Sequence, residues 1–145
     1  LGEFYISHPK MTIPAEGKTF SFDYKYYHCV DEPVRHFLDA CNYSDNGKDG
    51  RYSCRNAGCM VADMHRIFLH GGIFLYPARK DRPHGKLRLM YECNPMAFLA
   101  ELCGGSATNG RQRIMDILPA HIHERSPVFI GSKKITDGLM LKKRD

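Results

Sequence analysis

The chain has 145 residues, which is enough for one domain that buries its own hydrophobic core. Its formal net charge of +5 favours anionic ligands, although charge alone does not separate a small phosphate ester from a nucleic acid. No apolar run approaches the roughly 18 residues of a membrane helix and no signal peptide is recognisable, so we expect a cytoplasmic protein without a membrane partner. The six cysteines include no C-x-x-C pair, which favours reduced thiols over a disulfide framework or a zinc site.

The chain begins with two segments that predict strands. Apolar and polar side chains alternate weakly over residues 2–13 and more clearly over residues 18–23, where Phe20 and Phe22 share one face. Asp31 then predicts the N-cap of a helix whose apolar side chains recur at i, i+3, i+4 and i+7. These side chains are Val34, Phe37, Leu38 and Cys41. We expect this helix to pack on a sheet.

A loop, a second helix and a short strand are expected next. Residues 42–53 are rich in Asn, Asp, Gly and Ser and lack periodicity, which indicates an exposed loop. A helix is predicted over residues 58–70, with the pair Gly71-Gly72 as its stop signal. The apolar run over residues 73–76 predicts a buried strand directly after this helix.

The most informative segment is KLRLMYECNPMAFLAE, at residues 86–101. Lys86, Arg88 and Glu92 fall on one face if the segment begins as a strand, because side chains of a strand alternate. Asn94, followed by a proline, predicts the N-cap of a helix that starts directly after this strand. An acid and two bases beside the free N–H groups of a helix indicate a site for phosphate and a metal. An ordinary buried strand with solvated terminal charges is the alternative.

The remaining elements complete an α/β pattern. Short strands are predicted over residues 106–108 and 126–131, so strands and helices are interspersed along the chain and a layered α/β fold is expected. His121 and His123 would lie on one face of a strand, where a metal pair is one interpretation and a solvated or packing role is the more common one.

A nucleic-acid-binding module is the alternative from a different functional class. Two basic clusters, at residues 79–82 and 142–144, would attract a polyanion. They lack the interleaved aromatic residues on which single-stranded bases stack, and the sequence offers no docking motif. We therefore expect a solvated loop and a solvated tail at these clusters, and no nucleic-acid partner.

Several motifs resemble one enzyme family. GGIFLYPARKDRPHGKLRLMYECNPMAFLAELCGG at residues 71–105, with MVADMHR at residues 60–66, is similar to the C-terminal half of class I fructose-1,6-bisphosphatases. GEFYIS near the start and SPVFIGS at residues 126–132 also fit that family. The resemblance implies the layered sheets and helices of the sugar-phosphatase type. Residues 1–145 would form the C-terminal, sugar-phosphate-binding portion of that fold, and the N-terminal metal-binding half would be absent from this chain.

The resemblance also implies roles for individual residues. The positions that correspond to ligands of the remote phosphate of the sugar are Tyr26, Arg55, Tyr76 and Lys86. Arg55 would reach into the site of a neighbouring subunit, and Met60 would offer its backbone N–H to the sugar. Arg88 would lie near the reacting phosphate as a catalytic residue, and Glu92 would be a metal ligand.

The family hydrolyses the 1-phosphate of fructose 1,6-bisphosphate to fructose 6-phosphate and inorganic phosphate, with Mg2+ as cofactor and Mn2+ or Zn2+ as alternatives. One carboxylate is not a metal site, and phosphoester hydrolysis commonly uses two ions. The other ligands would come from acidic motifs in the first half of the family's chains, including an Asp-Pro-x-Asp-Gly-Ser segment that does not occur here. This chain alone should therefore not turn over substrate. The resemblance also implies a homotetramer.

Two positions depart from the family pattern. Asp23 stands where the family has an Asn that donates to the remote phosphate, and a carboxylate there would repel a dianion. Asn56 stands where the family has a Tyr, which removes a hydroxyl donor. A paralogue that acts on another sugar bisphosphate, or a non-catalytic sugar-phosphate-binding protein, is therefore the alternative within the same fold.

Overall fold

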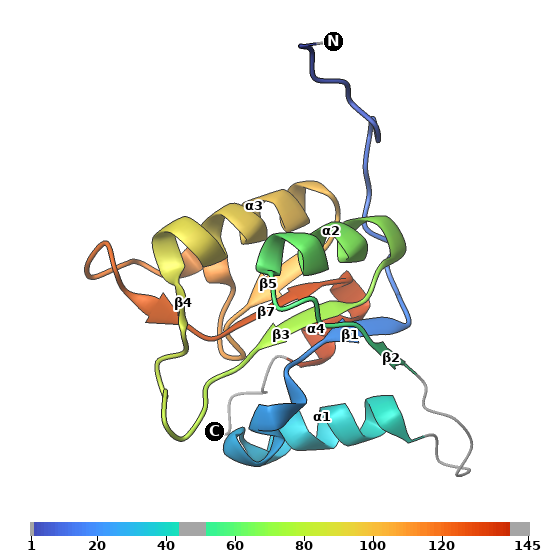
Figure 1. Ribbon diagram of the computed structural model, residues 1–145. Coiled ribbons are helices and arrows are strands. Elements are labelled where there is room, and N and C mark those ends of the chain that lie inside the picture. Colours follow the sequence, from blue (N-terminus) through green and yellow to red (C-terminus); the bar gives the residue numbers. More distant parts are fainter. Residues whose placement is uncertain (1, 44–51, 140–145) are drawn as a thin grey trace.

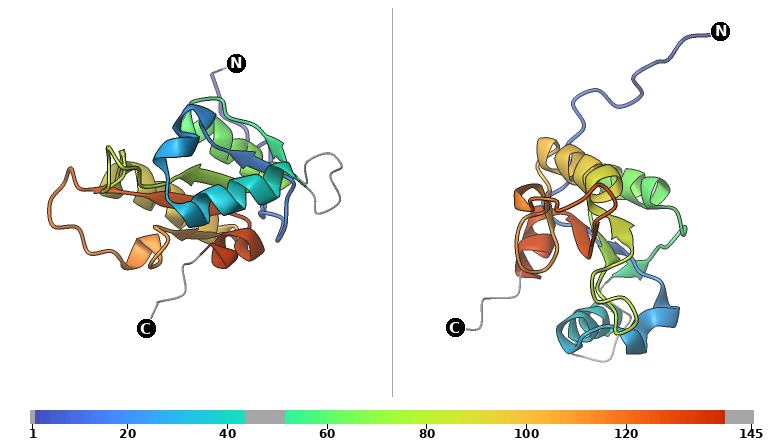
Figure 2. Two further views of the ribbon diagram at one scale, coloured as in Figure 1. Left: turned by 90° about the horizontal axis from the view of Figure 1, so that it is seen from below. Right: turned by 90° about the vertical axis from the view of Figure 1, so that its left-hand side faces the viewer.

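The computed structural model describes residues 2–43 and 52–139, which form a sheet between two layers of helices (Figures 1 and 2). Within these residues, five strands make up the sheet in the order β2-β1-β3-β7-β5. The strands are β1 (Thr19–Ser21), β2 (Ser53–Cys54), β3 (Ile73–Tyr76), β5 (Ser106–Thr108) and β7 (Val128–Gly131). The layered α/β class expected from the sequence is confirmed, as is the strand predicted at residues 73–76.

The strands of this sheet run in mixed directions. β1 is parallel to both β2 and β3, whereas β7 is antiparallel to both β3 and β5. Phe20 pairs with Ile73, and Phe74 pairs with Ile130, which fixes the register at the centre. Because β1, β2 and β3 run the same way, their carboxyl ends meet at one edge, which is where open α/β sheets commonly bind ligands.

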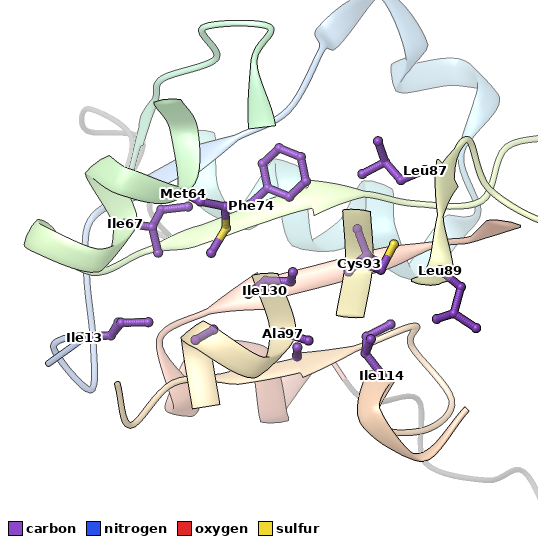
Figure 3. Packing of buried hydrophobic residues seen from close by; sticks show 13 residues of the cluster. Ile13, Met64, Ile67, Phe74, Leu87, Leu89, Cys93, Ala97, Ile114 and Ile130 are labelled. Carbon is purple, nitrogen blue, oxygen red and sulfur yellow. The ribbon is translucent and has the colours of Figure 1, made fainter. Parts of the chain in front are cut away.

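Two helices, α2 (Met60–His70) and α3 (Asn94–Leu102), cover one face of the sheet (Figure 1). Figure 3 shows the apolar core beneath them, to which both helices and the central strands contribute. Its members include Met64, Ile67, Phe74, Cys93, Ala97, Ala100, Ile114, Val128 and Ile130. Because α3 turns small side chains inward, its backbone lies close to the sheet, and its larger Phe98 and Leu102 are exposed.

The opposite face of the sheet is covered by α1 (Glu32–Asn42) and α4 (Lys133–Gly138). Leu38 and Cys41 of α1 are buried there, and Val34 and Phe37 pack against the same cluster, as the apolar stripe predicted. Phe20 and Phe22 also share this core. The sheet therefore buries both of its faces, with successive side chains of β3 going to opposite cores.

The junction between α2 and β3 depends on two glycines. Gly71 has a φ of 72° and Gly72 a φ of 120°, both in the range that favours glycine. A Cβ atom on Gly72 would lie 2.2 Å from the carbonyl oxygen of Thr19. The predicted stop signal is therefore correct, and it also allows β3 to approach β1 closely.

Two strand predictions outside the candidate site are wrong. Residues 2–13 form no strand, and Phe4 and Tyr5 are exposed, because no neighbouring strand supplies ladder hydrogen bonds. His121 and His123 lie in a turn, so they do not share a strand face. The His123 Nδ1 atom instead lies 3.1 Å from the Tyr91 hydroxyl.

Two short 3-10 helices, η1 (Tyr24–Cys29) and η3 (Ile114–Asp116), complete the secondary structure used below. No helix in the described part of the chain is long and apolar enough to cross a membrane. Residues 44–51 of the predicted loop, and the basic cluster at residues 142–144, lie outside the described residues.

Candidate functional site

The candidate site lies at the edge where β1, β2 and β3 end. The helix η1 follows β1 almost directly and carries Tyr26, while Tyr76 is the last residue of β3. Arg55 follows β2, and its backbone N–H donates to the carbonyl of Phe20 in β1 at 2.7 Å. The parallel topology therefore brings together residues that lie far apart in the sequence.

A small hollow of about 10 Å3 opens at this edge. Its lining residues are Phe22, Asp23, Tyr26, Leu75, Tyr76, Pro77 and Arg79. The Nζ atom of Lys86 lies 5.8 Å from the centroid of the Tyr76 ring. The structure thus gathers Asp23, Tyr26 and Tyr76 at one hollow, with Lys86 beside the Tyr76 ring. The sequence had singled out all four residues.

Positive charge surrounds the Tyr26 ring. The Arg79 guanidinium carbon lies 3.6 Å from the ring centroid, and the Lys25 Nζ atom lies 4.7 Å from it. Polar contacts of the phenol with Arg79 and then with Lys25 lower the pKa of Tyr26. A more acidic phenol is a stronger hydrogen-bond donor to an anion. Lys25 also pairs with Asp23, whose Oδ2 atom lies 2.9 Å from Nζ, so the Asp23 carboxylate is partly neutralised.

Arg79 is the site residue that the sequence reasoning missed. Its cluster was expected to be a solvated loop, but Arg79 is only 6% exposed, whereas Lys80 and Arg82 are exposed as expected. The sequence signal that could have found it is its position three residues after Tyr76, in the loop that leaves the candidate edge. Burial of an arginine requires partners from other elements, which local composition does not reveal.

Arg55 and Asn56 form the second part of the edge. Both side chains are exposed, and the Asn56 Oδ1 atom accepts a hydrogen bond from the Gly58 N–H at 2.9 Å. The buried carboxylate of Asp63 accepts from the Ala57 N–H at 2.9 Å, which ties this segment to α2.

Met60 is the first residue of α2. Backbone N–H groups in the first turn of a helix have no partner within that helix, so the N–H of Met60 suits the contact with a ligand that the resemblance implied.

Arg88 and Glu92 form a third group. Arg88 ends β4 (Leu87–Arg88), which pairs with β6 (Arg125–Ser126). The Glu92 Oε2 atom accepts from the Arg88 N–H at 2.7 Å and lies 3.4 Å from the Arg88 guanidinium. Both side chains are partly exposed, so the acid and the base are available at the surface as one pair.

The predicted strand of residues 86–92 is wrong beyond Arg88. A π-helical turn, η2 (Leu89–Cys93), begins directly after β4 and continues into α3. Asn94 is therefore not an N-cap, because it already has helical angles of φ −60° and ψ −47°. Glu92 reaches Arg88 through the four-residue spacing of a helix, rather than by sharing a strand face with it.

The described residues supply one suitable metal ligand, Glu92. The carboxylate of Glu92 is the kind of ligand that a hard divalent cation prefers. Among the described residues, however, no group of three or more His, Cys, Asp or Glu side chains could hold a metal ion. Glu92 fits as one ligand of a metal, and these residues do not form a metal site by themselves.

Comparison with known proteins matches this chain to one family. The model of the fructose-1-6-bisphosphatase C-terminal domain matches residues 13–141. A class 1 fructose-1,6-bisphosphatase of Chloroherpeton thalassium is 46% identical over 134 residues, covering 92% of this chain and 38% of the relative. That of Nitratidesulfovibrio vulgaris is 46% identical, covering 94% of this chain and 42% of the relative. A cytosolic fructose-1,6-bisphosphatase of Brassica napus is 48% identical, covering 91% of this chain and 39% of the relative.

The chain thus spans 38 to 42% of the length of these relatives. Both the sequence motifs and the layered fold agree with the match over residues 13–141. The chain therefore belongs to the family of fructose-1,6-bisphosphatase C-terminal domains.

Proposed function

We propose that this chain is the sugar-phosphate-binding part of an enzyme that hydrolyses fructose 1,6-bisphosphate to fructose 6-phosphate and inorganic phosphate. The observation that carries this proposal is the convergence of Tyr26 and Tyr76 on one hollow at the carboxyl edge of β1 and β3, with Lys86 beside the Tyr76 ring. A phosphate monoester carries about −1.5 to −2 charges at neutral pH, and it is bound best by several such donors at once. The names of the relatives support the choice of substrate.

Binding of the remote phosphate is the role that fits the hollow. The hydroxyl groups of Tyr26 and Tyr76 would donate to the phosphate oxygens, and Lys86 would supply a positive charge. Met60 would add a backbone donor from the first turn of α2. The exposed side chain of Arg55 is consistent with its proposed reach into a neighbouring subunit, and we propose a homotetramer as the assembly.

The reacting phosphate would lie near the Arg88–Glu92 pair. Arg88 would neutralise part of its charge, and Glu92 would hold one Mg2+ ion, or Mn2+ or Zn2+, together with ligands from outside the described residues. When bound, such a cation supplies charge neutralisation and an activated water. We further propose that the enzyme is cytoplasmic and serves gluconeogenesis, in line with the cytosolic relatives.

A change of substrate is the second candidate function. It is favoured by Asp23, whose carboxylate lines the hollow where a donor would suit a phosphate better. The protein would then act on another sugar bisphosphate, or bind a sugar phosphate without hydrolysing it.

Phosphate release from fructose 1,6-bisphosphate tests the first proposal. The full-length protein would be assayed with Mg2+ and with EDTA, beside Glu92→Gln and the matched control Glu32→Gln. A glutamine at position 92 can still accept from the Arg88 N–H, so the fold should persist while the carboxylate ligand is lost. The control residue is exposed at the start of α1, which packs on the opposite face of the sheet from α3 (Figure 1).

We expect metal-dependent release that falls by more than roughly 100-fold in Glu92→Gln and is unchanged in Glu32→Gln. A folded, metal-loaded protein that releases no phosphate from fructose 1,6-bisphosphate would contradict the proposal. Turnover of another sugar bisphosphate, or tight binding of a sugar phosphate without turnover, would then favour the second candidate.

A further inference from the structure

Arg79 is held rigidly at the mouth of the hollow. It lies in the turn after β3, where Arg79 and Arg82 exchange backbone hydrogen bonds of 3.1 and 2.9 Å. The N–H of the next residue, Lys80, donates to the carbonyl of Cys29 at 3.0 Å and so fastens this turn to η1. The position of the Arg79 side chain is therefore set by two elements of the fold.

The guanidinium group of Arg79 has an unused donor. Its Nη2 atom donates to Asp81 Oδ2 at 3.1 Å, and its flat face stacks on the Tyr26 ring. Its Nη1 atom is buried and has no hydrogen-bond partner. Buried polar atoms are almost always paired, since an unpaired donor bears the full cost of desolvation. Arg79 lines the hollow, where a ligand could supply the missing hydrogen-bond acceptor.

The charges around the hollow favour an anion. Lys25 pairs with Asp23, and Asp81, the partner of Arg79, is itself 58% exposed and therefore screened. Lys86 beside Tyr76 has no such acidic partner among the described residues. The hollow thus keeps an excess of positive charge although a carboxylate lines it.

We propose that Arg79 binds the phosphate of the sugar that is remote from the reaction, with Nη1 donating to a phosphate oxygen. This proposal rests on the proposed function. The hollow has room for about one water-sized atom, so one phosphate oxygen would enter it and the others would lie at its mouth. Arginine suits this role because its fixed fork can hold Asp81 through one nitrogen and the phosphate through another.

The test compares Arg79→Gln and Arg79→Lys with Arg82→Gln, a half-exposed arginine of the same turn. For each full-length variant, kcat and KM for fructose 1,6-bisphosphate would be measured. Binding of fructose 6-phosphate and of inorganic phosphate would be measured by calorimetry, and the melting temperature would report the fold. We expect Arg79→Gln to raise KM and the Kd for fructose 6-phosphate by about 10-fold to 100-fold, as loss of a charge-assisted hydrogen bond predicts. The kcat should change little, and Arg82→Gln should behave as the wild type.

The two phosphate ligands separate the sources of the anion. Weaker binding of fructose 6-phosphate alone would assign Arg79 to a sugar-linked phosphate, and weaker binding of both ligands would assign it to phosphate in general; either result supports the proposal. An unchanged KM and Kd in a folded Arg79→Gln variant would overturn it and leave the proposed function intact. If the wild type binds fructose 6-phosphate without turnover and Arg79→Gln loses that binding, the proposed function fails and the role of Arg79 stands.

Arg79→Lys decides the case in which Arg79→Gln does not fold. Lysine keeps the charge and much of the packing on Tyr26, but it cannot hold Asp81 and a phosphate through separate planar donors. Weaker fructose 6-phosphate binding by folded Arg79→Lys would support the proposal, and wild-type binding would overturn it.

Discussion

Replacement of Asp63 tests whether one buried carboxylate holds the segment that carries Arg55 and Met60. Asp63 is 1% exposed, and its two oxygens lie 2.9 and 3.2 Å from the Ala57 nitrogen. The Arg66 Nη1 atom is 3.6 Å from Asp63 Oδ1, but the Arg66 side chain is 38% exposed, so solvent screens this pair. The hydrogen bond from the Ala57 N–H therefore contributes more to the free energy of unfolding than the ion pair with Arg66 does.

The magnitude follows from these contacts. Asp63→Ala removes a charge-assisted hydrogen bond and leaves the Ala57 N–H without its acceptor, which costs about 1.5–3 kcal/mol. The screened pair with Arg66 adds up to about 0.5 kcal/mol. We expect the free energy of unfolding to fall by about 1.5–3.5 kcal/mol in Asp63→Ala. Asp63→Asn keeps an oxygen acceptor, so its loss should be about half as large.

Urea unfolding of the full-length protein, followed by circular dichroism, would measure these losses. Asp116→Ala is the matched control, because Asp116 is 58% exposed and pairs with Arg113 at the surface. Its loss should stay within about 1 kcal/mol. Hydrogen exchange should become faster at residues 55–60 in Asp63→Ala. A loss below about 0.5 kcal/mol, without faster exchange there, would refute the reasoning.

Three further outcomes are expected. Gly72→Ala should lower the free energy of unfolding in urea by more than about 2 kcal/mol, because its Cβ would lie 2.2 Å from a backbone oxygen. The control Gly58→Ala, whose Cβ would meet no atom within 4 Å, should lower it by about 1 kcal/mol. Equal losses would contradict this prediction. Burial raises the pKa of the Cys54 thiol, so Cys54 should react with iodoacetamide at pH 8 more slowly than the exposed Cys59 does. Mass spectrometry would measure both rates, and the reverse order would contradict this prediction. Residues 1–145 expressed alone should release no phosphate from fructose 1,6-bisphosphate with Mg2+, because the described residues supply one proposed metal ligand, Glu92, and no metal site. Metal-dependent release would refute this.

The elements predicted correctly are those with a local signal. In α1 the apolar residues repeat at helical spacing, so the face that would pack was visible before any contact was known. The pair Gly71-Gly72 marks the end of α2 because the backbone there needs positive φ, which depends on few neighbours. The family resemblance added Tyr26, Tyr76 and Lys86, which composition and spacing alone would not have joined.

The junction after β4 was mispredicted because its sequence fits two periods. Leu87 and Leu89 alternate with charged residues as in a strand, yet Leu89 and Cys93 are also spaced as on one face of a helix. Both Leu89 and Cys93 are fully buried in the core beneath α3, so packing selects the helical turn. The strand pairing stops at Arg88, which pairs with Arg125, the first residue of the antiparallel strand β6.

Whether Asp23 prevents phosphate binding depends on charged residues from other parts of the sequence. A carboxylate at this position, taken alone, argues against a bound dianion. In the folded chain, Lys25 pairs with that carboxylate, and Arg79 enters the same hollow from a turn more than fifty residues later in the sequence. If Arg79 binds the phosphate, the charge lost at Asp23 is replaced from another element, and Asp23 need not abolish sugar-phosphate binding. The electrostatic balance of this site is therefore a property of the sheet edge as a whole, because the topology joins η1 to the turn after β3.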